Sequence, residues 1–344
     1  MNKRSQNVRK RTYGASTLYA EAWKDATGHY AFGSNVQASE KGRWPTQRGV
    51  LVLQQSLYSD GCSTQADLFS AVTTYTYYQP IQGNQIPATL PENQMRGGLF
   101  ARVSKGRKDF DLVFRMKNLD LGSYMPKIYD AFWEYDRWSP THQRWGYQSI
   151  LVMENLLDNA QTLLNRYMGD REQFGSRYKL FNRLFMMLEL VWGLAHAHSQ
   201  GLFHGDVAFH NVMTRSEGSY SDEWDWVIID WETATITSPG DGIRRYGSGD
   251  VRNAGICLLE AGVPKMSDEL GPQARLGNCD SIDEVMEVLE EAGLDTTQHT
   301  EFYTLVAKAT YQDGTGITMA QFYDSLADLQ ENGMEDLPWI EWKP

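Results

Sequence analysis

Three polar residues at a distinctive spacing are the first candidates for chemistry: Asp206, Asn211 and Asp230. Asp206 and Asn211 stand five positions apart, and Asp230 ends the apolar run 227–229, nineteen positions after Asn211. In such a pattern one carboxylate can orient an attacking hydroxyl group, while an amide and a second carboxylate hold Mg²⁺ against nucleotide phosphates. The pattern therefore predicts phosphoryl transfer from ATP, with all three residues catalytic and with Asn211 and Asp230 as metal ligands.

Two helices are expected to position these residues. The stretch from Phe181 to Ser199 is apolar nearly all round, which predicts a buried helix that stops at Gly201. A second helix, from Ser248 to Glu260 downstream of Asp230, is implied by the family resemblance described next. The apolar run before Asp230 predicts a short buried strand.

The residues of this region resemble the catalytic core of the protein-kinase-like superfamily. His204-Gly-Asp206 and Asp230-Trp-Glu232 are more similar to its aminoglycoside-phosphotransferase and choline-kinase branch than to eukaryotic protein kinases. The resemblance implies an α+β, bilobal protein-kinase-like fold with a small β-rich N-terminal lobe and a mostly helical C-terminal lobe. It also implies that His204 supports the metal-binding turn, and that Asp250 caps its helix and bonds back to the backbone of the Asp206 loop.

The resemblance suggests three parts along the 344-residue chain. Residues 1–96 would form an N-terminal extension and part of the first lobe, 97–154 the nucleotide-binding lobe, and 155–344 the helical catalytic lobe. Within the first part, residues 49–55 predict a buried strand and residues 63–75 predict a helix with a Ser or Thr N-cap.

Two arrangements compete for the nucleotide-binding lobe. In the first, residues 97–103 and 112–117 form a hairpin, whose glycine pair covers the phosphates while Lys117, or Arg115, reaches the α- and β-phosphates. The alternation of apolar and basic residues in 112–117 favours this hairpin, and we prefer it.

In the second arrangement residues 99–103 are a strand, and residues 107–118 are the regulatory helix that the resemblance implies. Arg102 then stands where the family has lysine. A forked guanidinium does not replace a lysine point charge without consequence.

Residues 125–134 and 147–154 predict two paired strands. The end of the second strand resembles the hinge of the family, where Met153 would gate the adenine pocket and the backbone at Glu154 and Leu156 would bind the adenine edge. The alternative is an apolar core strand that simply ends at an acidic turn.

The sequence departs from the protein-kinase pattern at several positions. Ala208 stands where protein Ser/Thr kinases usually have lysine, and Ile317 stands where an arginine would pair with the missing Ala-Pro-Glu motif. His210 could neutralise phosphoryl charge when protonated, or could be structural. The four histidines between 196 and 210 match no closed zinc ligand set.

Composition limits the remaining possibilities. A net charge of −12 argues against a nucleic-acid surface. The sequence predicts no signal peptide and no membrane span, and its three scattered cysteines fit a reducing compartment. We therefore expect an intracellular, cytoplasmic protein.

Three functions compete. The first, which we favour, is an ATP- and Mg²⁺-dependent phosphotransferase acting on a hydroxyl acceptor, either a protein or a small molecule. The second is a pseudokinase that binds nucleotide weakly or not at all and serves as a scaffold or regulatory protein. The third is an interaction protein that uses the fold only structurally and makes contacts through Trp133, Trp138 and Trp145.

Overall fold

A computed structural model divides the chain into two compact units, which consist of residues 1–120 with 126–155 and of residues 121–125 with 156–344. In the described residues unit 1 is mainly β-structure and unit 2 mainly helical, so the chain is a mixed α and β protein. The roles predicted for residues 1–96, 97–154 and 155–344 stay predictions. The structure describes residues 7–13, 16–24, 30–36, 48–56, 66–73, 99–105, 112, 115–116, 119, 123–126, 128–139, 144–169, 182–215, 225–263, 275–338 and 340.

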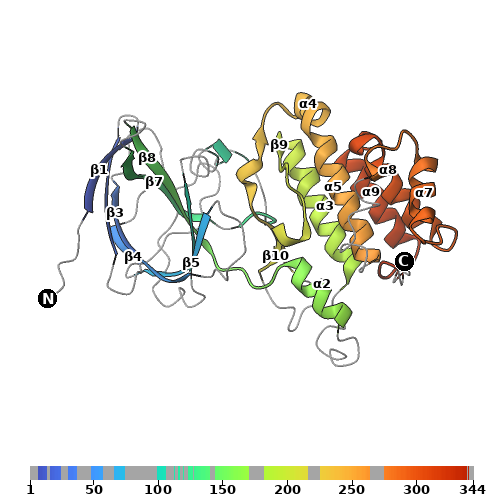
Figure 1. Cartoon of the computed structure of the whole chain (residues 1–344), viewed down its shortest axis with the longest axis horizontal. Coiled ribbons are helices and arrows are strands. Elements are labelled where there is room, and N and C mark those ends of the chain that lie inside the picture. Colours follow the sequence, from blue (N-terminus) through green and yellow to red (C-terminus); the bar gives the residue numbers. More distant parts are fainter. Residues whose placement is uncertain are drawn as a thin grey trace. The chain divides into compact units, whose positions relative to one another are not determined.

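Within these residues, unit 1 contains an eight-stranded antiparallel sheet with the order β1-β2-β3-β4-β5-β6-β8-β7 (Figure 1). The strand expected at 49–55 is confirmed, as is the pair expected at 125–134 and 147–154. The helix expected at 63–75 is wrong, because strand pairing on both sides overrides the local helix signal there. The strands are β1 (Asn7–Tyr13), β2 (Ser16–Lys24), β3 (Tyr30–Val36), β4 (Arg48–Ser56), β5 (Ala66–Thr73), β6 (Leu99–Lys105), β7 (Ile128–Ser139) and β8 (Arg144–Glu154).

The preferred hairpin of the nucleotide-binding lobe is wrong. β6 pairs with β5 on one side and with β8 on the other, and Leu112, Arg115 and Met116 are helical. Leu112 and Met116 are buried while Arg115 is exposed, which is the i, i+4 pattern of a helix face rather than strand alternation. The strand-and-helix arrangement agrees with the structure. Lys117 lies outside the described residues. The prediction that it binds the phosphates depended on the hairpin, and that support is gone.

Unit 2 is built from helices and two small two-stranded sheets in its described residues (Figure 1). No helix among those residues is long and apolar enough to cross a membrane. The helices are α2 (Ala160–Gly169), α3 (Arg183–Ser199), α4 (Pro239–Gly242), α5 (Ser248–Gly262), α7 (Ile282–Glu291), α8 (Thr300–Thr310) and α9 (Met319–Glu331). The strands are β9 (Leu202–Phe203), β10 (Val212–Thr214), β11 (Trp226–Ile228) and β12 (Thr235–Ile236).

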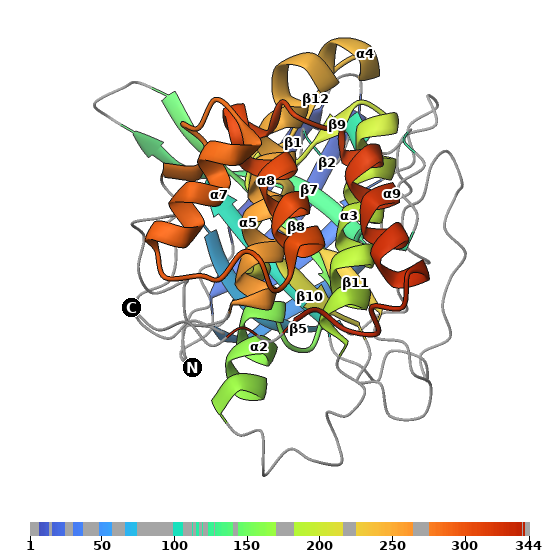
Figure 2. The same cartoon turned by 90° about the vertical axis from the view of Figure 1, so that its right-hand side faces the viewer.

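The core of unit 2 forms around α3, which packs against α9 and α5 (Figure 2). Asn182 caps the helix by accepting the backbone N–H of Phe185 at 2.8 Å. The helix stops at Gly201, whose φ of +77° favours glycine; a Cβ there would lie 2.0 Å from the carbonyl oxygen of Thr237. The predicted buried helix with a glycine stop is therefore confirmed.

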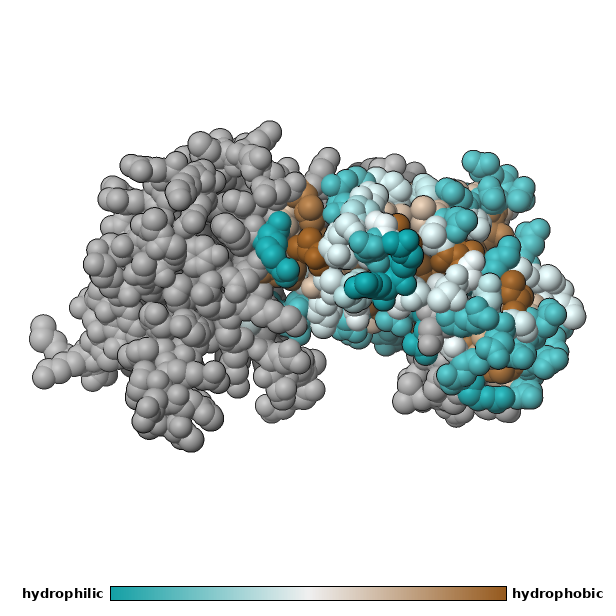
Figure 3. All heavy atoms as spheres, turned by 90° about the horizontal axis from the view of Figure 1, so that it is seen from above, coloured by the Kyte–Doolittle hydropathy of each residue, from teal (hydrophilic) through white to brown (hydrophobic). Residues whose placement is uncertain are grey.

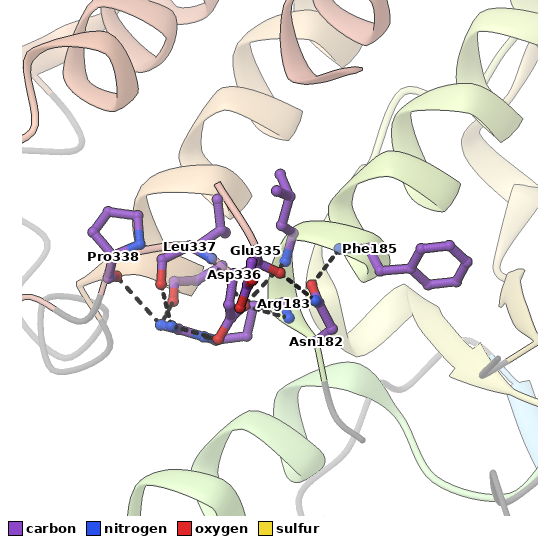
Figure 4. A network of polar contacts seen from close by, with 9 residues as sticks. Asn182, Arg183, Phe185, Glu335, Asp336, Leu337 and Pro338 are labelled. Carbon is purple, nitrogen blue, oxygen red and sulfur yellow. Dashed lines mark hydrogen bonds and ion pairs between the residues drawn. The ribbon is translucent and has the colours of Figure 1, made fainter. Parts of the chain in front are cut away.

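The start of α3 is tied to the segment 335–338 (Figure 4). Arg183 is buried, and its guanidinium pairs with Asp336 at 2.9 Å and donates to the carbonyl oxygens of Ala261 and Leu337. The backbone N–H of Arg183 also donates to Asp336 at 2.8 Å. Because the guanidinium is both paired and hydrogen-bonded, its burial beside the ends of α3 and α5 is tolerated.

Candidate active site

The candidate site is the loop 204–211, which follows directly after β9. Val207 and Phe209 are buried, while Asp206 and His210 are exposed. The apolar residues fix the loop to the core of unit 2, and the intervening polar side chains reach solvent. The loop ends in the single 3-10 turn η2 (Phe209–Asn211), which leads straight into β10.

A fully buried carboxylate holds the beginning of this loop. Asp250, in the first turn of α5, accepts the backbone N–H of His204 and that of Gly205, both at 2.7 Å. His198 Nε2 donates to the same carboxylate at 2.8 Å. The predicted bond from Asp250 to the loop backbone is confirmed. The predicted helix cap is wrong, because the π-helix η4 (Ile243–Gly247) runs without interruption into α5.

His204 joins the loop to the turn that carries Asp230. Its Nε2 lies 2.8 Å from the carbonyl oxygen of Ile229, and its Nδ1 lies 3.2 Å from the backbone nitrogen of Asp206. A carbonyl only accepts and a backbone N–H only donates, so the imidazole is the tautomer with its hydrogen on Nε2. The ring therefore positions the backbone of Asp206, and the structural role expected for His204 agrees with these contacts.

Asn211 binds Asp206 directly. Its Nδ2 donates to the carbonyl oxygen of Asp206 at 2.9 Å and to the carboxylate at 3.3 Å. Asn211 is buried, so its amide can turn little. The exposed carboxylate of Asp206 is thus held from both directions, by His204 through the backbone and by Asn211 through the side chain.

Asp230 is brought beside Asn211 by strand pairing. β10 and β11 pair in antiparallel register, and just beyond them the backbone N–H of Ile229 donates to the carbonyl oxygen of Asn211 at 2.8 Å. Asp230 itself has φ 62° and ψ 49°, the left-handed conformation that aspartate and asparagine adopt more readily than other side chains. The three residues predicted from spacing therefore belong to one connected network in unit 2.

The oxygen atoms that this network presents are compatible with ligation of a hard cation. The Nδ2 of Asn211 is used on Asp206, and its Oδ1 accepts no hydrogen bond from any residue that the structure describes. Asp230 is partly exposed and adds a carboxylate. Oxygen donors of this kind are those that Mg²⁺ prefers, so these residues fit the metal implied by the sequence.

The thiol of Cys257 lies behind the loop, close to the backbone of Phe209. Burial raises the pKa of Cys257 well above its usual value, and the charge of Glu260 raises it further. The thiol therefore stays protonated and behaves as a small apolar group in the wall behind the loop.

The residues predicted to bind adenine lie where the chain passes from unit 1 to unit 2 in the sequence. β8 ends at Glu154, whose side chain is buried; Met153 and Leu156 are partly exposed. After Leu156 the chain is bound to β10, since Leu157 donates its N–H to Thr214 at 2.8 Å. The adenine contacts predicted for Met153, Glu154 and Leu156 stay predictions.

Sequence reasoning missed two residues that hold the Asp230 turn. The hydroxyl of Thr233 donates to the carbonyl oxygen of His204 at 2.8 Å. The indole N–H of Trp231 donates to Ile228 at 2.8 Å, and its ring meets the His204 ring edge-on at 4.6 Å. Trp231 and Thr233 were visible beside Asp230, but their direction depends on the pairing of β12 with β9.

The histidines near the loop have separate surroundings. His196 stacks on Trp192 with ring centroids 5.6 Å apart, His198 bonds to Asp250, and His204 bonds to Ile229. His210 is exposed on η2. Among the described residues, no group of three or more histidine, cysteine or acidic side chains could hold a metal ion.

Comparisons with known proteins place the chain in no family. No protein-family model matches its sequence, and no curated protein matches it. A search of solved structures finds similarity to the crystal structure of the pseudokinase PEAK1 (Sugen Kinase 269), with 13% sequence identity and a TM-score of 0.43. The match covers 78% of this chain and 66%, slightly under two thirds, of that one.

Proposed function

We propose that this protein transfers the γ-phosphoryl group of ATP to a hydroxyl group of an acceptor, which is a protein or a small molecule. One observation carries this proposal: the carboxylate of Asp206 is exposed, while its backbone and side chain are held by His204 and Asn211. An exposed acid whose position is fixed from a buried network is what hydroxyl activation requires.

Each residue of the network has a role in this reaction. Asp206 accepts the hydrogen bond of the acceptor hydroxyl and orients its oxygen toward the phosphorus atom. Asn211 and Asp230 hold Mg²⁺, which when bound neutralises charge on the phosphates. His204 and Asp250 hold no substrate and act by keeping the loop backbone in place.

Nucleotide binding is tested first, by thermal unfolding with ATP in the presence and absence of Mg²⁺. A ligand that binds only the folded state at about 100 times its Kd adds roughly 2.7 kcal/mol of stability. We expect a clear rise of the unfolding temperature that requires Mg²⁺. If the unfolding temperature rises neither with ATP alone nor with ATP and Mg²⁺, the proposal is contradicted.

Turnover is tested by comparing the wild-type protein with Asp206→Asn, using ATP consumption and labelling of protein, sugar, aminoglycoside and choline acceptors. Loss of a positioned acid–base group costs about a hundredfold or more in rate. ATP binding should stay unchanged, because Asp206 is not a proposed metal ligand. Asp241→Asn, which alters an exposed carboxylate outside the network, is the matched control and should keep full activity.

A pseudokinase is the second candidate, favoured by the surroundings of Arg102 on β6. In the arrangement that agrees with the structure, Arg102 stands at the family's lysine position, and its Nε donates to the hydroxyl of Ser104 at 3.2 Å. A guanidinium held in this way differs from a lysine ammonium in shape and hydration. Nucleotide stabilisation without any turnover, or equal turnover in wild type and Asp206→Asn, would support this second function.

A further inference from the structure

The segment 239–247, formed by α4 and η4, presents an unusual surface that the proposed reaction does not use. Four consecutive side chains are exposed: those of Ile243, Arg244, Arg245 and Tyr246. Ile243 is 36% exposed and Tyr246 43% exposed, which places both among the few large apolar residues that unit 2 leaves open to solvent in its described part. In Figure 1 α4 lies at the upper edge of unit 2.

Helix geometry explains why all four side chains point outward. In an α-helix, four consecutive residues span more than one full turn, so at least one faces inward. Here the residues facing inward are Gly242 and Gly247, five positions apart, which matches the i to i+5 repeat of a π-helix. A Cβ at Gly242 would lie 1.9 Å from Phe203 Cε2, so the segment admits only backbone at this position; at Gly247 the nearest atom to an added Cβ would lie 3.7 Å away.

The apolar pattern of this segment is the reverse of an ordinary surface helix. Such a helix buries its apolar residues and exposes its polar ones. This segment buries glycine backbone and exposes Ile243 and Tyr246 on either side of two arginines. The ring of Tyr246 lies 6.2 Å from that of Phe203, so the outer surface is anchored to the core at the strand just before the Asp206 loop.

The charges of the segment favour an anionic partner. Arg244 pairs with Asp241 at 2.6 Å, but both side chains are exposed and such pairs are weak. The hydrogen bond from the hydroxyl of Ser238 lowers the pKa of Asp241, and Arg244 lowers it further, so that carboxylate stays ionised. Arg245 forms no ion pair with any residue that the structure describes, which leaves a guanidinium fork for a carboxylate from another molecule.

We propose that Ile243, Arg244, Arg245 and Tyr246 form a docking surface for an acidic segment of a partner polypeptide that carries apolar side chains between its carboxylates. Tyrosine and arginine are among the residues most enriched at the positions that dominate binding energy in protein interfaces.

The rest of the molecule directs such a partner to this surface. The whole chain carries a net charge of −12, and α7 exposes a row of acidic residues: Asp283, Glu284, Glu287, Glu290 and Glu291. Acidic surfaces such as that of α7 repel an acidic partner, so we expect the partner to bind at the two arginines instead. Figure 3, which views the molecule from above, shows separate apolar residues among hydrophilic ones on the face that includes α4.

The test uses the full chain and a fluorescein-labelled peptide in which glutamates alternate with leucines. Its fluorescence anisotropy should rise with protein concentration until it saturates. The affinity should fall as salt is added, because salt screens the charges. Arg245→Glu should reduce the affinity at least about tenfold, and Ile243→Ala and Tyr246→Ala should each reduce it too. Arg275→Glu is the control, because Arg275 is also exposed but lies outside the segment, where it pairs with Glu291; it should change the affinity by less than about twofold.

Three results would overturn the proposal. The first is no binding of the acidic peptide, or equal binding of a peptide with lysines in place of glutamates. The second is an equal loss in Arg245→Glu and Arg275→Glu, which would indicate a general charge effect. The third is a concentration-dependent dimer, seen by light scattering without peptide and abolished by Arg245→Glu, which would make a second copy the occupant. An unchanged unfolding temperature in each variant excludes misfolding as the cause.

Discussion

His198 and Asp250, which lie 52 positions apart in the chain, share a buried hydrogen bond of 2.8 Å. The same carboxylate receives the backbone N–H groups of His204 and Gly205. One side chain of α5 thus connects the end of α3 to the loop that carries Asp206. Since Asp250 is fully buried, these three donors are what make its burial tolerable.

Asp250→Asn should destabilise unit 2, because the new amide nitrogen cannot accept and leaves at least one buried N–H without an acceptor. A lost hydrogen bond to a charged group costs about 1.5 to 3 kcal/mol. Urea unfolding followed by tryptophan fluorescence measures this loss. Asp241→Asn is the control and should leave the unfolding midpoint unchanged. Equal midpoints for the two variants would show that the Asp250 contacts add no stability.

Asp230→Asn should remove the Mg²⁺-dependent part of nucleotide stabilisation while the fold is retained. Asparagine tolerates the left-handed backbone at this position as well as aspartate does, so the turn should persist. The loss of one ligand charge weakens the hold on a divalent cation. Thermal unfolding with ATP, with and without Mg²⁺, gives the answer, and an unchanged ATP–Mg²⁺ shift would remove Asp230 from the metal site.

Gly242→Ala should destabilise unit 2, whereas Gly240→Ala in the same short helix should not. The added methyl at 242 would overlap the ring of Phe203, and overpacking of this kind costs about 1 to 3 kcal/mol. At 240 no atom lies within 4 Å of the added methyl. Because alanine has less conformational freedom than glycine in the unfolded chain, this change should raise the free energy of unfolding by about 0.4 to 1 kcal/mol. Denaturant titrations of both variants test the predicted opposite signs.

Tyr303→Phe should stabilise unit 2, since the buried hydroxyl of Tyr303 has no hydrogen-bond partner among the described residues. Removing an unsatisfied polar group gains about 1 kcal/mol. Burial, with a further contribution from Asp295, raises the pKa of Tyr303 from 10.0 to about 12. The unfolded chain therefore loses this proton first as pH rises, so the wild-type protein loses stability between those two values.

The phenylalanine variant lacks this titration. Its advantage over the wild type should be constant below pH 10 and should grow as the pH rises above 10. Urea unfolding of both proteins at neutral and at alkaline pH measures the difference. A constant difference across the whole range would show that the hydroxyl is hydrated in the folded protein.

The sequence predicted those parts of the fold that depend on local pattern. These parts are α3 with its glycine stop and the strands β4, β7 and β8. All of them could be predicted, because the spacing of apolar residues along a short stretch of sequence indicates a buried helix or strand. The helix predicted at 63–75 and the hairpin predicted at 97–117 failed for one reason. In both cases the outcome depends on which distant strand pairs with β5 or β6, and neither the N-cap signal at 63–75 nor the alternation at 112–117 contains that information.

The candidate site shows the same division. Spacing singled out Asp206, Asn211 and Asp230, and the bond from Asp250 to the loop followed from the resemblance. Spacing could not show that Trp231 packs on His204 or that Thr233 bonds to its carbonyl, because both contacts depend on the left-handed backbone at Asp230 and on the pairing of β12 with β9. That conformation depends on tertiary structure more than on residue type.

The tie between Arg183 and Asp336 also constrains how the protein is made. The two residues are 153 positions apart, so Asp336 leaves the ribosome long after α3 has been synthesised. At about 5 to 20 residues per second, this delay is roughly 8 to 30 seconds. During that time a guanidinium destined for the interior lacks its carboxylate, and α3 cannot complete its packing against α9. The helical unit therefore matures only after Asp336 has left the ribosome, and nascent chains that are released before that point are substrates for chaperones and proteases.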